Sequence, residues 1–448
     1  MKIVILGAGA VGFHLARNLA RDGHDIVVID GDPAKVAQVD EQVDCIARVG
    51  NATSPDVLVK AEVGEADLVI AVTSVDEVNI LACALAKVLG AKMRIARVRN
   101  QEFTRRSDLI HPERLGVDLI IHPEQEAARE IVRLLRHGYA FEHHVFENGR
   151  VHLAGVTPTE DSIVLGRTLA ELGRDLRDFA FRIVAIDRDG TAITPTGRDK
   201  IELGDRVYVI ALSQHVSKIG EIAGIKNHVS RNVMILGAGL VGVMVAKELE
   251  GDKRCNVKLI ESSRSRSSDA ADLLKEAIVV RGVGADVDLL AQEGITEMDA
   301  FIAATEDDEL NVVCSLMARH LKVPRVITLV SKVEYLPIIR TIGLDVAINV
   351  QRLTSNAILT HIRQGQVISV AGTKGIPAEM IEFRLAATSP LVGKKLMDVK
   401  FPKGSVVGAH VRGDDVSIAT GQTELAADDR LVVFTLPQAA KQVTKMFA

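Results

Sequence analysis

Gly7-Ala8-Gly9-Ala10-Val11-Gly12 follows the apolar run Ile3-Val4-Ile5-Leu6, and half a chain later Gly237-Ala238-Gly239-Leu240-Val241-Gly242 follows Val233-Met234-Ile235-Leu236. Between a strand and a helix, GxGxxG is typical of a dinucleotide-binding turn. The first glycine allows the tight turn, the second admits a pyrophosphate, and the third lets the helix pack close to the sheet. The phosphates then meet free N–H groups at the positive end of the helix dipole. A plain strand–helix turn would explain one such motif, whereas two of them indicate a duplicated nucleotide binder.

The composition bounds the class of protein. The chain has 448 residues, so we expect three or four domains, because single cores stop growing at about 250–300 residues. It is 47% hydrophobic and 25% charged, as in ordinary soluble globular proteins. The net charge of −5 provides no basic field for nucleic acid or anionic lipid. Aromatic residues make up 3%, with no Trp, which argues against stacking platforms for nucleic-acid bases.

The cysteines indicate the compartment. None lies in a CxxC or zinc-like spacing, and we expect no signal peptide and no metal site. A reducing cytoplasmic compartment with buried free thiols is therefore predicted for all four cysteines: Cys45, Cys83, Cys255 and Cys314. No run reaches the roughly 20 apolar residues that span a bilayer, so any membrane contact is expected to go through a membrane protein.

Apolar runs and helical spacings alternate over residues 1–123, which predicts parallel βαβ units in a doubly wound sheet. A helix from Glu124 to His137 then leads out of this domain. Residues 143–227 read as a small α+β module with short strands and an Asp189-Gly190 hairpin turn. His143-His144 is expected to be a surface pair in the linker before it. The expected strands are Ile3–Leu6, Ile26–Ile29, Asp67–Val72, Met93–Val98, Leu119–Ile121, Arg182–Ile186, Thr191–Ile193 and Arg206–Leu212.

The pattern then restarts, with 231–350 repeating the first domain and 367–448 repeating the module. Glu261 corresponds to Asp30, and Gly393 of the second module corresponds to Gly166 of the first. The predicted fold class is therefore α/β: two tandem Rossmann-like doubly wound domains, each followed by a small α+β domain. Three further pairs share one offset: Thr73 with Thr305, Asp76 with Asp308, and Asn79 with Asn311.

An acid closes the second strand of each predicted Rossmann domain. Asp30 ends Ile26-Val27-Val28-Ile29-Asp30, and Glu261 ends Val257-Lys258-Leu259-Ile260-Glu261. A carboxylate about 20 residues beyond the glycine turn accepts hydrogen bonds from the adenosine ribose, and it disfavours a 2′-phosphate. We therefore expect NAD rather than NADP at both turns. The arginines of Ser262-Ser263-Arg264-Ser265-Arg266 are interpreted as a solvated helix start, with phosphate contact as the alternative.

The ends of the fourth and fifth strands should face the ligand crevice. We place Thr73 and Thr305 near the ligand, and assign Asp76 and Asn79 to capping or helix packing. Ser74 is a further candidate contact, although Ser74 with Glu77 also fits a capping box. Arg97 can stack on adenine or pair with phosphate, with a surface salt bridge as the alternative. Its counterpart is expected at about Thr328, so the two sites should not be equivalent.

Catalytic machinery is not evident in the pattern. Hydride transfer needs an acid–base group near the nicotinamide and a substrate pocket, and no recurring His–Asp or Tyr–Lys pair supplies one. A regulatory module that binds nucleotide at two sites is therefore favoured, and we expect no enzymatic activity. An NAD-dependent oxidoreductase stays as the alternative, and a sensor that acts on another kind of protein is a weaker one.

These motifs resemble a known family over the whole chain: the TrkA regulatory subunits of Trk-type potassium uptake systems, built from RCK N-terminal and C-terminal domains in tandem. The motifs are Ile5-Leu6-Gly7-Ala8-Gly9, Ala71–Asn79, Arg94-Ile95-Ala96-Arg97-Val98, Leu236–Gly239 and Ala304–Asn311. The resemblance implies NAD(H), with ATP or ADP as alternatives, at Gly7–Val11, Asp30, Thr73 and Arg97, and at Gly237–Val241, Glu261 and Thr305. It also implies a homo-tetrameric ring in the cytoplasm, held at the inner membrane by a membrane-embedded potassium transporter subunit that it gates.

Overall fold

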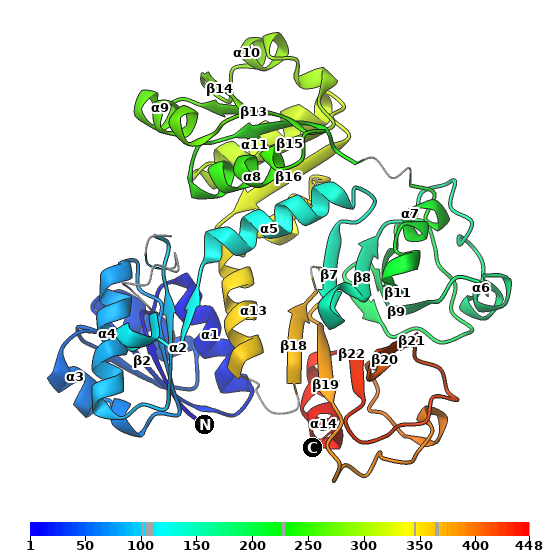
Figure 1. Ribbon diagram of the computed structural model, residues 1–448, viewed down its shortest axis with the longest axis horizontal. Helices are drawn as coiled ribbons and strands as arrows, with labels where there is room; N and C mark the ends of the chain where they lie inside the picture. The colour runs from blue at the N-terminus through cyan, green and yellow to red at the C-terminus, as the bar shows by residue number, and fades with distance from the viewer. Residues whose placement is uncertain are drawn as a thin grey trace. The chain divides into compact units, whose positions relative to one another are not determined.

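The computed structural model describes residues 1–100, 103, 112–176, 178–225, 229–344, 346–362, 367–373 and 375–447. They form two compact units, whose elements are labelled in Figure 1. The first unit comprises Met1–Ala127 with Asn349–Leu359, and the second comprises Ala128–Ile348 with Thr360–Ala448. The predicted domain ends at 227 and 448 lie outside the described residues.

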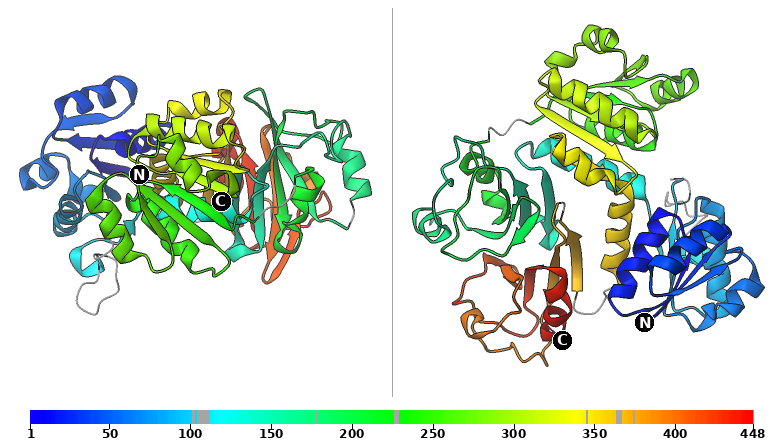
Figure 2. Two further views of the ribbon diagram at one scale, coloured as in Figure 1. Left: turned by 90° about the horizontal axis from the view of Figure 1, so that it is seen from above. Right: turned by 180° about the vertical axis from the view of Figure 1, so that it is seen from behind.

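The first unit contains a six-stranded sheet in the order β3-β2-β1-β4-β5-β6, with every pair of neighbours parallel. Helices α1 and α2 pack on β1, β2 and β3, while α4 packs on β4 and β5 (Figures 1 and 2). This is the doubly wound arrangement that the sequence predicts. Its strands are β1 (Lys2–Leu6), β2 (Asp25–Asp30), β3 (Ile46–Val49), β4 (Leu68–Ala71), β5 (Met93–Arg97) and β6 (Leu119–Ile121). Its helices are α1 (Ala10–Arg21), α2 (Pro33–Gln42), α3 (Pro55–Lys60) and α4 (Asp76–Leu89), and α5 (Pro123–Arg136) follows.

Burial explains why these segments take these forms. All four residues of Ile3–Leu6 are fully buried, as expected for a parallel strand with both faces covered. On α1, Leu15 and Leu19 lie one turn apart and are both fully buried, so the helix presents one apolar face to the protein core. Helix α4 ends at Gly90, whose φ of 110° is the left-handed C-cap that glycine favours.

The second unit contains the repeat of this sheet, in the order β14-β13-β12-β15-β16-β17. The described neighbours from β14 to β16 are parallel, so the predicted duplication of the Rossmann-like fold is confirmed. Its strands are β12 (Asn232–Leu236), β13 (Asn256–Glu261), β14 (Ile278–Arg281), β15 (Ala300–Ala303), β16 (Arg325–Val330) and β17 (Val346–Asn349). Its helices are α8 (Leu240–Glu250), α9 (Arg264–Leu273), α10 (Val287–Gln292), α11 (Asp308–His320) and α12 (Tyr335–Thr341), and α13 (Val350–Ile362) follows.

Two small five-stranded sheets complete the second unit, in the orders β10-β9-β11-β8-β7 and β18-β19-β22-β20-β21. Their strand pairs are antiparallel, which confirms the predicted α+β modules. The first module holds β7 (Glu142–Phe146), β8 (Val151–Val156), α6 (Leu169–Asp175), β9 (Phe181–Arg188), β10 (Thr191–Ile193), β11 (Arg206–Leu212) and α7 (Lys218–Ile222). The second holds β18 (Val367–Gly372), β19 (Glu379–Arg384), β20 (Ser405–Arg412), β21 (Asp415–Ile418), β22 (Arg430–Thr435) and α14 (Pro437–Phe447).

Two predictions about individual side chains are wrong. His143 is not on the surface of a linker: it lies on β7, is fully buried, and its Nε2 is 3.1 Å from Nδ1 of His152 on β8. Burial holds the pKa of His143 far below its usual range, so the ring is neutral. The cysteines are all free, but only Cys83 and Cys314 are buried, whereas Cys45 and Cys255 are partly exposed.

The two small sheets contact each other within the second unit. A Cβ added to Gly408 of β20 would lie 2.0 Å from the Ile210 side chain of β11, so a larger residue at this crossing would require Ile210 to shift. Arg182 donates to the carbonyl of Ala419 at 2.7 Å, and Arg150 donates to the carbonyl of Asp414 at 2.9 Å. The close approach of β20 to β11 and the two arginine hydrogen bonds therefore join the two modules.

A pair of buried glutamates lies in this contact. Glu147, in the short helix η4 (Glu147–Gly149), pairs at 3.0 Å with Arg150 and at 3.0 Å with Arg430 of β22. Glu382 of β19 is 3% exposed and accepts a hydrogen bond of 2.7 Å from Ser369. Burial, together with the hydrogen-bonded carboxyl of Glu147, raises the pKa of Glu382 to about 7. Glu382 is therefore held in its protonated form below neutral pH.

This pair predicts a pH-dependent stability. The unfolded chain releases the Glu382 proton near pH 4.5 and the folded chain only near 7, so stability is fully present below 4.5 and falls as the pH rises through 7. We expect a loss of about 1–3 kcal/mol between pH 5 and pH 8, the cost of a poorly satisfied buried polar group. Glu382→Gln should remove this loss, because its amide stays neutral and still donates. Thermal unfolding at several pH values measures the effect.

The exposed Glu160 of the first module provides the matched control, since Glu160→Gln should leave the pH profile of the wild type unchanged. Parallel pH profiles for the wild type and Glu382→Gln would contradict the assignment.

Candidate functional site

The first glycine turn joins β1 to α1, and sterics account for two of its three glycines. Gly7 has a φ of 114°, and a Cβ there would approach the backbone of Val72 and Thr73 to 3.0 Å. A Cβ on Gly12 would lie 1.8 Å from the carbonyl oxygen of Gly7. A Cβ on Gly9, in contrast, would meet nothing within 4 Å. The fold thus requires the first and third glycines, while the second leaves open space above the turn.

The second turn, between β12 and α8, has the same geometry. Gly237 has a φ of 104°, with the backbone of Ala304 and Thr305 as close as 2.8 Å to an added Cβ. A Cβ on Gly242 would lie 2.0 Å from the carbonyl oxygen of Gly237. A Cβ on Gly239 would have only the carbonyl oxygen of Ala304 near it, at 3.9 Å.

Each turn also leaves the N-terminus of its helix uncapped by a side chain. Gly9 is the N-cap of α1 and Gly239 that of α8, and neither helix has a side-chain cap. No side chain therefore occupies the first-turn N–H groups as a cap, which an anion site requires. The other predicted turn residues lie at these two helix starts: Ala8, Ala10 and Val11 in the first copy, and Ala238, Leu240 and Val241 in the second.

The predicted acids lie against these turns. Asp30 accepts hydrogen bonds of 2.6 Å from the amide of Ala8 and 2.8 Å from the amide of Asp32. Glu261 accepts corresponding bonds of 2.9 Å from Ala238 and 2.7 Å from Ser263, and it is 3% exposed. Both carboxylates therefore lie at the end of the second strand, beside the glycine turn, where a ribose hydroxyl is expected in this fold.

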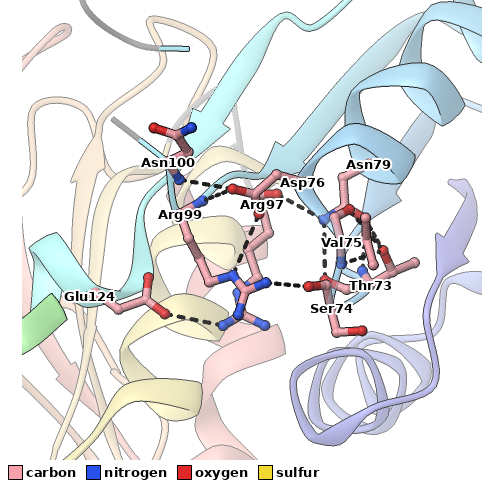
Figure 3. Close-up of polar contacts among 9 residues, drawn as sticks. All are labelled: Thr73, Ser74, Val75, Asp76, Asn79, Arg97, Arg99, Asn100 and Glu124. Atoms are coloured by element: carbon pink, nitrogen blue, oxygen red, sulfur yellow. Dashed lines mark hydrogen bonds and ion pairs between the residues drawn. The ribbon is translucent and has the colours of Figure 1, made fainter. Parts of the chain in front are cut away.

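Asn79 organises the strand ends in the first copy (Figure 3). Its Oδ1 accepts hydrogen bonds from the backbone N of Thr73 at 2.8 Å and from its Oγ1 at 2.7 Å. Its Nδ2 donates to the carbonyls of Thr73 at 3.2 Å and Arg97 at 2.8 Å. Asn79 thus ties the end of β4 to the end of β5, and Thr73 and Arg97 are brought together as predicted.

Asp76 fixes the segment after β5 (Figure 3). Its Oδ2 accepts hydrogen bonds of 2.8 Å from the backbone amides of both Arg99 and Asn100, and Oδ1 lies 3.5 Å from Nε of Arg99. Arg99 also donates to the carbonyl of Ser74. The Ser74–Glu77 capping box is wrong: α4 begins at Asp76, its N-cap is Val75, and no side chain caps it.

Arg97 pairs with Glu124 at the start of α5, with 3.3 Å between Nη2 and Oε1 (Figure 3). The two side chains are 19% and 14% exposed, so Arg97 forms a salt bridge, as the alternative interpretation expected, but this salt bridge is largely buried. Nε of Arg97 and Oε2 of Glu124 are buried and have no hydrogen-bond partner among the described residues. Such orphaned polar atoms are expected where a ligand supplies the missing partner.

The second copy repeats the asparagine clamp but not the arginine. Asn311 binds Thr305 through the same three contacts and donates to the carbonyl of Leu329 at 3.0 Å. Because Asn79 donates to the carbonyl of Arg97, the counterpart of Arg97 is Leu329. The expected position, about Thr328, falls one residue short: Thr328 pairs with Ala303 in the sheet, is fully buried, and donates to Ser315. The two sites are unequal, with an arginine in one and a leucine in the other.

Sequence reasoning missed Glu124 and Arg99 as members of this site. Each contacts a partner more than twenty residues away in the chain, so no local spacing reveals it. The signal available was placement: Glu124 follows β6 and Arg99 follows β5, at the same edge of the sheet as Thr73. Within the described ranges, no group of three or more His, Cys, Asp or Glu side chains could hold a metal ion. None of the described helices has the length and hydropathy needed to cross a bilayer.

Comparison with protein families matches the chain in four segments. The TrkA-N domain model matches residues 3–123 and 233–350, and the TrkA-C domain model matches residues 153–224 and 380–448. The chain is 33% identical over 454 residues to "Trk system potassium uptake protein TrkA homolog 2" of Methanosarcina mazei, covering 100% of each chain. It is 35% identical over 440 residues to "Trk system potassium uptake protein TrkA" of Haemophilus influenzae, covering 97% of this chain and 95% of the relative.

Among solved structures, the chain resembles the GsuK RCK domain with a TM-score of 0.62 at 20% identity, covering 100% of this chain and 94% of that one. It resembles the GsuK channel bound to NAD with the same TM-score and identity, covering 100% of this chain and 78% of that one. A third match is GsuK bound to ADP, with a TM-score of 0.52 at 18% identity, covering 81% of this chain and 69% of that one. At these identities the likeness shows the shared fold.

Proposed function

The chain belongs to the TrkA family, and on that premise we propose that it is a nucleotide-sensing regulatory subunit that gates a membrane-embedded potassium uptake transporter of the Trk type. The two relatives reported above are named for that uptake system, and the chain matches each of them over nearly its whole length. The ligand would act by binding two conformations of the protein with different affinity, because only such a difference shifts a conformational equilibrium.

The observation that carries the proposal is the pair of like turns. In each, the second glycine leaves open space beside an uncapped helix N-terminus, and an acid borders the turn. These residues fit NAD(H): amides at Gly9 and Gly239 would hold the pyrophosphate, and Asp30 and Glu261 the adenosine ribose. ATP or ADP would use the same groups. That GsuK was solved with NAD and with ADP supports this class of ligand.

We further propose how the remaining predicted residues contribute. Thr73, Ser74 and Thr305 would border the ligand at the ends of β4 and β15, where Asn79 and Asn311 hold the two threonines. Arg97 would contact phosphate or adenine in the first site through its buried Nε, a role that Leu329 cannot take in the second. The first site would therefore be the tighter one for an unmodified dinucleotide.

The four predicted segments, 1–123, 143–227, 231–350 and 367–448, are our proposed domains. We propose that they work as a homo-tetramer in the cytoplasm, bound to the inner membrane through the transporter subunit. Co-purification of the full chain with a polytopic potassium transporter tests this partner. Its recovery with an unrelated protein and no transporter would favour a sensor that acts elsewhere.

Replacing Asp30 tests the first site directly. Asp30→Ala is expected to weaken NADH binding there by about tenfold or more, because charge-assisted hydrogen bonds contribute about 1.5–3 kcal/mol. Isothermal calorimetry on the full chain should resolve the loss, and Glu261→Ala should give the equivalent loss at the second site. Asp30→Asn is the matched control for the turn, since its amide oxygen can still accept from Ala8. Unchanged affinity in both alanine variants would refute the site assignment.

An NAD-dependent oxidoreductase is the rival reading. The polar side chains at the strand ends favour binding over catalysis, because Asp76 and Asn79 form their hydrogen bonds with backbone groups. Absorbance assays with NADH and a panel of small carbonyl compounds separate the two. We expect no turnover, and sustained NADH consumption would overturn the regulatory reading.

A further inference from the structure

The two nucleotide turns differ in the charges that surround the end of their second strand. In the first copy, Asp30 is followed by Asp32, which caps α2 and lies 3.9 Å from Lys35. In the second copy, Glu261 is followed by Arg264 and Arg266 at the start of α9. The first copy thus carries an excess of negative charge at this point, and the second an excess of positive charge.

The neighbouring strand adds to the difference. In the sheet register, Asp30 pairs with Val49 of β3, whereas Glu261 pairs with Arg281 of β14. Helix α9 packs on both β13 and β14 (Figure 1), and it begins just after the end of β13, at the same edge of the sheet as the end of β14. Arg264 and Arg281 are exposed, and their side chains have no hydrogen-bond or ion-pair partner among the described residues. Two unpaired guanidinium groups therefore flank the acid of the second site.

Glu261 itself is already compensated. Its Oε1 accepts 2.9 Å and 2.7 Å hydrogen bonds from Arg266 and the amide of Ser263, and its Oε2 accepts from Ala238 at 2.9 Å. Burial opposes ionisation of Glu261, but these hydrogen bonds outweigh it and hold the pKa of Glu261 below its usual value. The Glu261 carboxylate is thus ionised and paired with Arg266. This pairing weakens the repulsion that a free carboxylate would exert on an incoming phosphate.

Other acids lie on the far side of the turn. Glu306 interacts electrostatically with Arg266, and Asp307 caps α11, both beyond the end of β15. In the strand order β14-β13-β12-β15, the arginines stand on one side of β12 and these acids on the other. A ribose beside Glu261 lies on the arginine side, since the acid at the end of the second strand is the group that meets the ribose hydroxyls.

We propose that the second site takes an adenine dinucleotide with a 2′-phosphate on its ribose, of the NADP(H) class, while the first site takes the unphosphorylated form. Arg264 and Arg281 supply the free charge for the phosphate, and Arg266 stays paired with Glu261, whose charge it compensates. The inference rests on the proposed function, namely that both turns bind nucleotide. It revises the expectation, made from the acid alone, that both copies prefer NAD.

Titration of the full chain with NADH and with NADPH, followed by nicotinamide fluorescence, tests the inference. A Gly9→Val background blocks the first turn, so that the second site is observed alone, and Gly239→Val isolates the first. We expect Gly9→Val protein to bind NADPH about tenfold or more tightly than NADH, and Gly239→Val protein to show the reverse order. Charge-assisted hydrogen bonds to phosphate account for a difference of that size.

Single substitutions then assign the specificity. In the Gly9→Val background, Arg281→Ala should weaken NADPH binding by about fivefold or more and leave NADH binding unchanged. Lys253→Ala removes an exposed cation just before β13, at the other end of that strand, and should leave the NADPH-to-NADH ratio as it was.

Tighter binding of NADH than of NADPH at the second site, or an equal loss of both nucleotides in Arg281→Ala, would overturn this inference and leave the proposed function intact. If neither NADH nor NADPH bound at either site, both the proposed function and this inference would be refuted.

Discussion

Gly9→Ala is expected to weaken NADH binding at the first site by about tenfold or more, about 1.4 kcal/mol, without lowering the thermal midpoint of unfolding. The fold has no need of glycine here: φ is −63°, and an added Cβ would meet nothing within 4 Å. The ligand does need it, because the second glycine of the fingerprint lets the pyrophosphate approach the backbone. Calorimetry with NADH and thermal unfolding of the same protein measure the two effects.

Gly12→Ala provides the contrast. Its Cβ would lie 1.8 Å from the carbonyl oxygen of Gly7, so the turn must open and both stability and binding should fall. Gly239→Ala is the corresponding substitution in the second site, where the nearest atom to the new Cβ is 3.9 Å away. Wild-type affinity in Gly9→Ala would mean that the nucleotide does not lie on this turn.

Asn79→Ala is expected to destabilise the first unit by about 2–4 kcal/mol and to weaken nucleotide binding at the first site as well. Asn79 is fully buried, and its side chain makes four hydrogen bonds to Thr73 and Arg97. Alanine leaves these backbone groups without partners, and each buried unsatisfied group costs about 1–3 kcal/mol. The ends of β4 and β5 then lose the clamp that positions Thr73 and Arg97. Chemical denaturation and calorimetry measure both effects.

Asn311→Ala is the matched substitution in the second copy. The same network surrounds Asn311, so a comparable loss of stability is expected in the second unit, with nucleotide affinity at the first site retained. A loss of less than about 1 kcal/mol in Asn79→Ala would show that the clamp is replaced by other contacts.

The strands and helices that the sequence predicted well are those set by local constraints. Gly90 ends α4 because a left-handed C-cap favours glycine, and Asp189-Gly190 forms the predicted hairpin turn with φ values of 52° and 82°. Strand β7, in contrast, was missed because its residues Glu142, His143 and His144 are polar. Burial inside the second unit, next to His152, makes that polar segment a strand.

The candidate site divides in the same way. The places of Gly7, Gly12, Asp30 and Glu261 could be predicted, because a tight turn and a strand end impose them within a short stretch of chain. The pairing of Arg97 with Glu124, and of Arg99 with Asp76, could not. Each joins the ends of different elements, and sequence spacing does not say which strand ends become neighbours. The register also moved the counterpart of Arg97 from Thr328 to Leu329, because single-residue alignment depends on backbone pairing.

The sequence by itself therefore determined that this protein contains two Rossmann-like domains with matching glycine turns and acids, since these turns and strand ends are local requirements of backbone geometry. Only the tertiary structure decided which side chains gather around each of the two turns. It pairs Arg97 with Glu124 in the first site, and it sets Arg281 in register with a Glu261 already bonded to Arg266 in the second. The physical reason is that electrostatics depends on distances through space, which the order of residues along the chain does not contain.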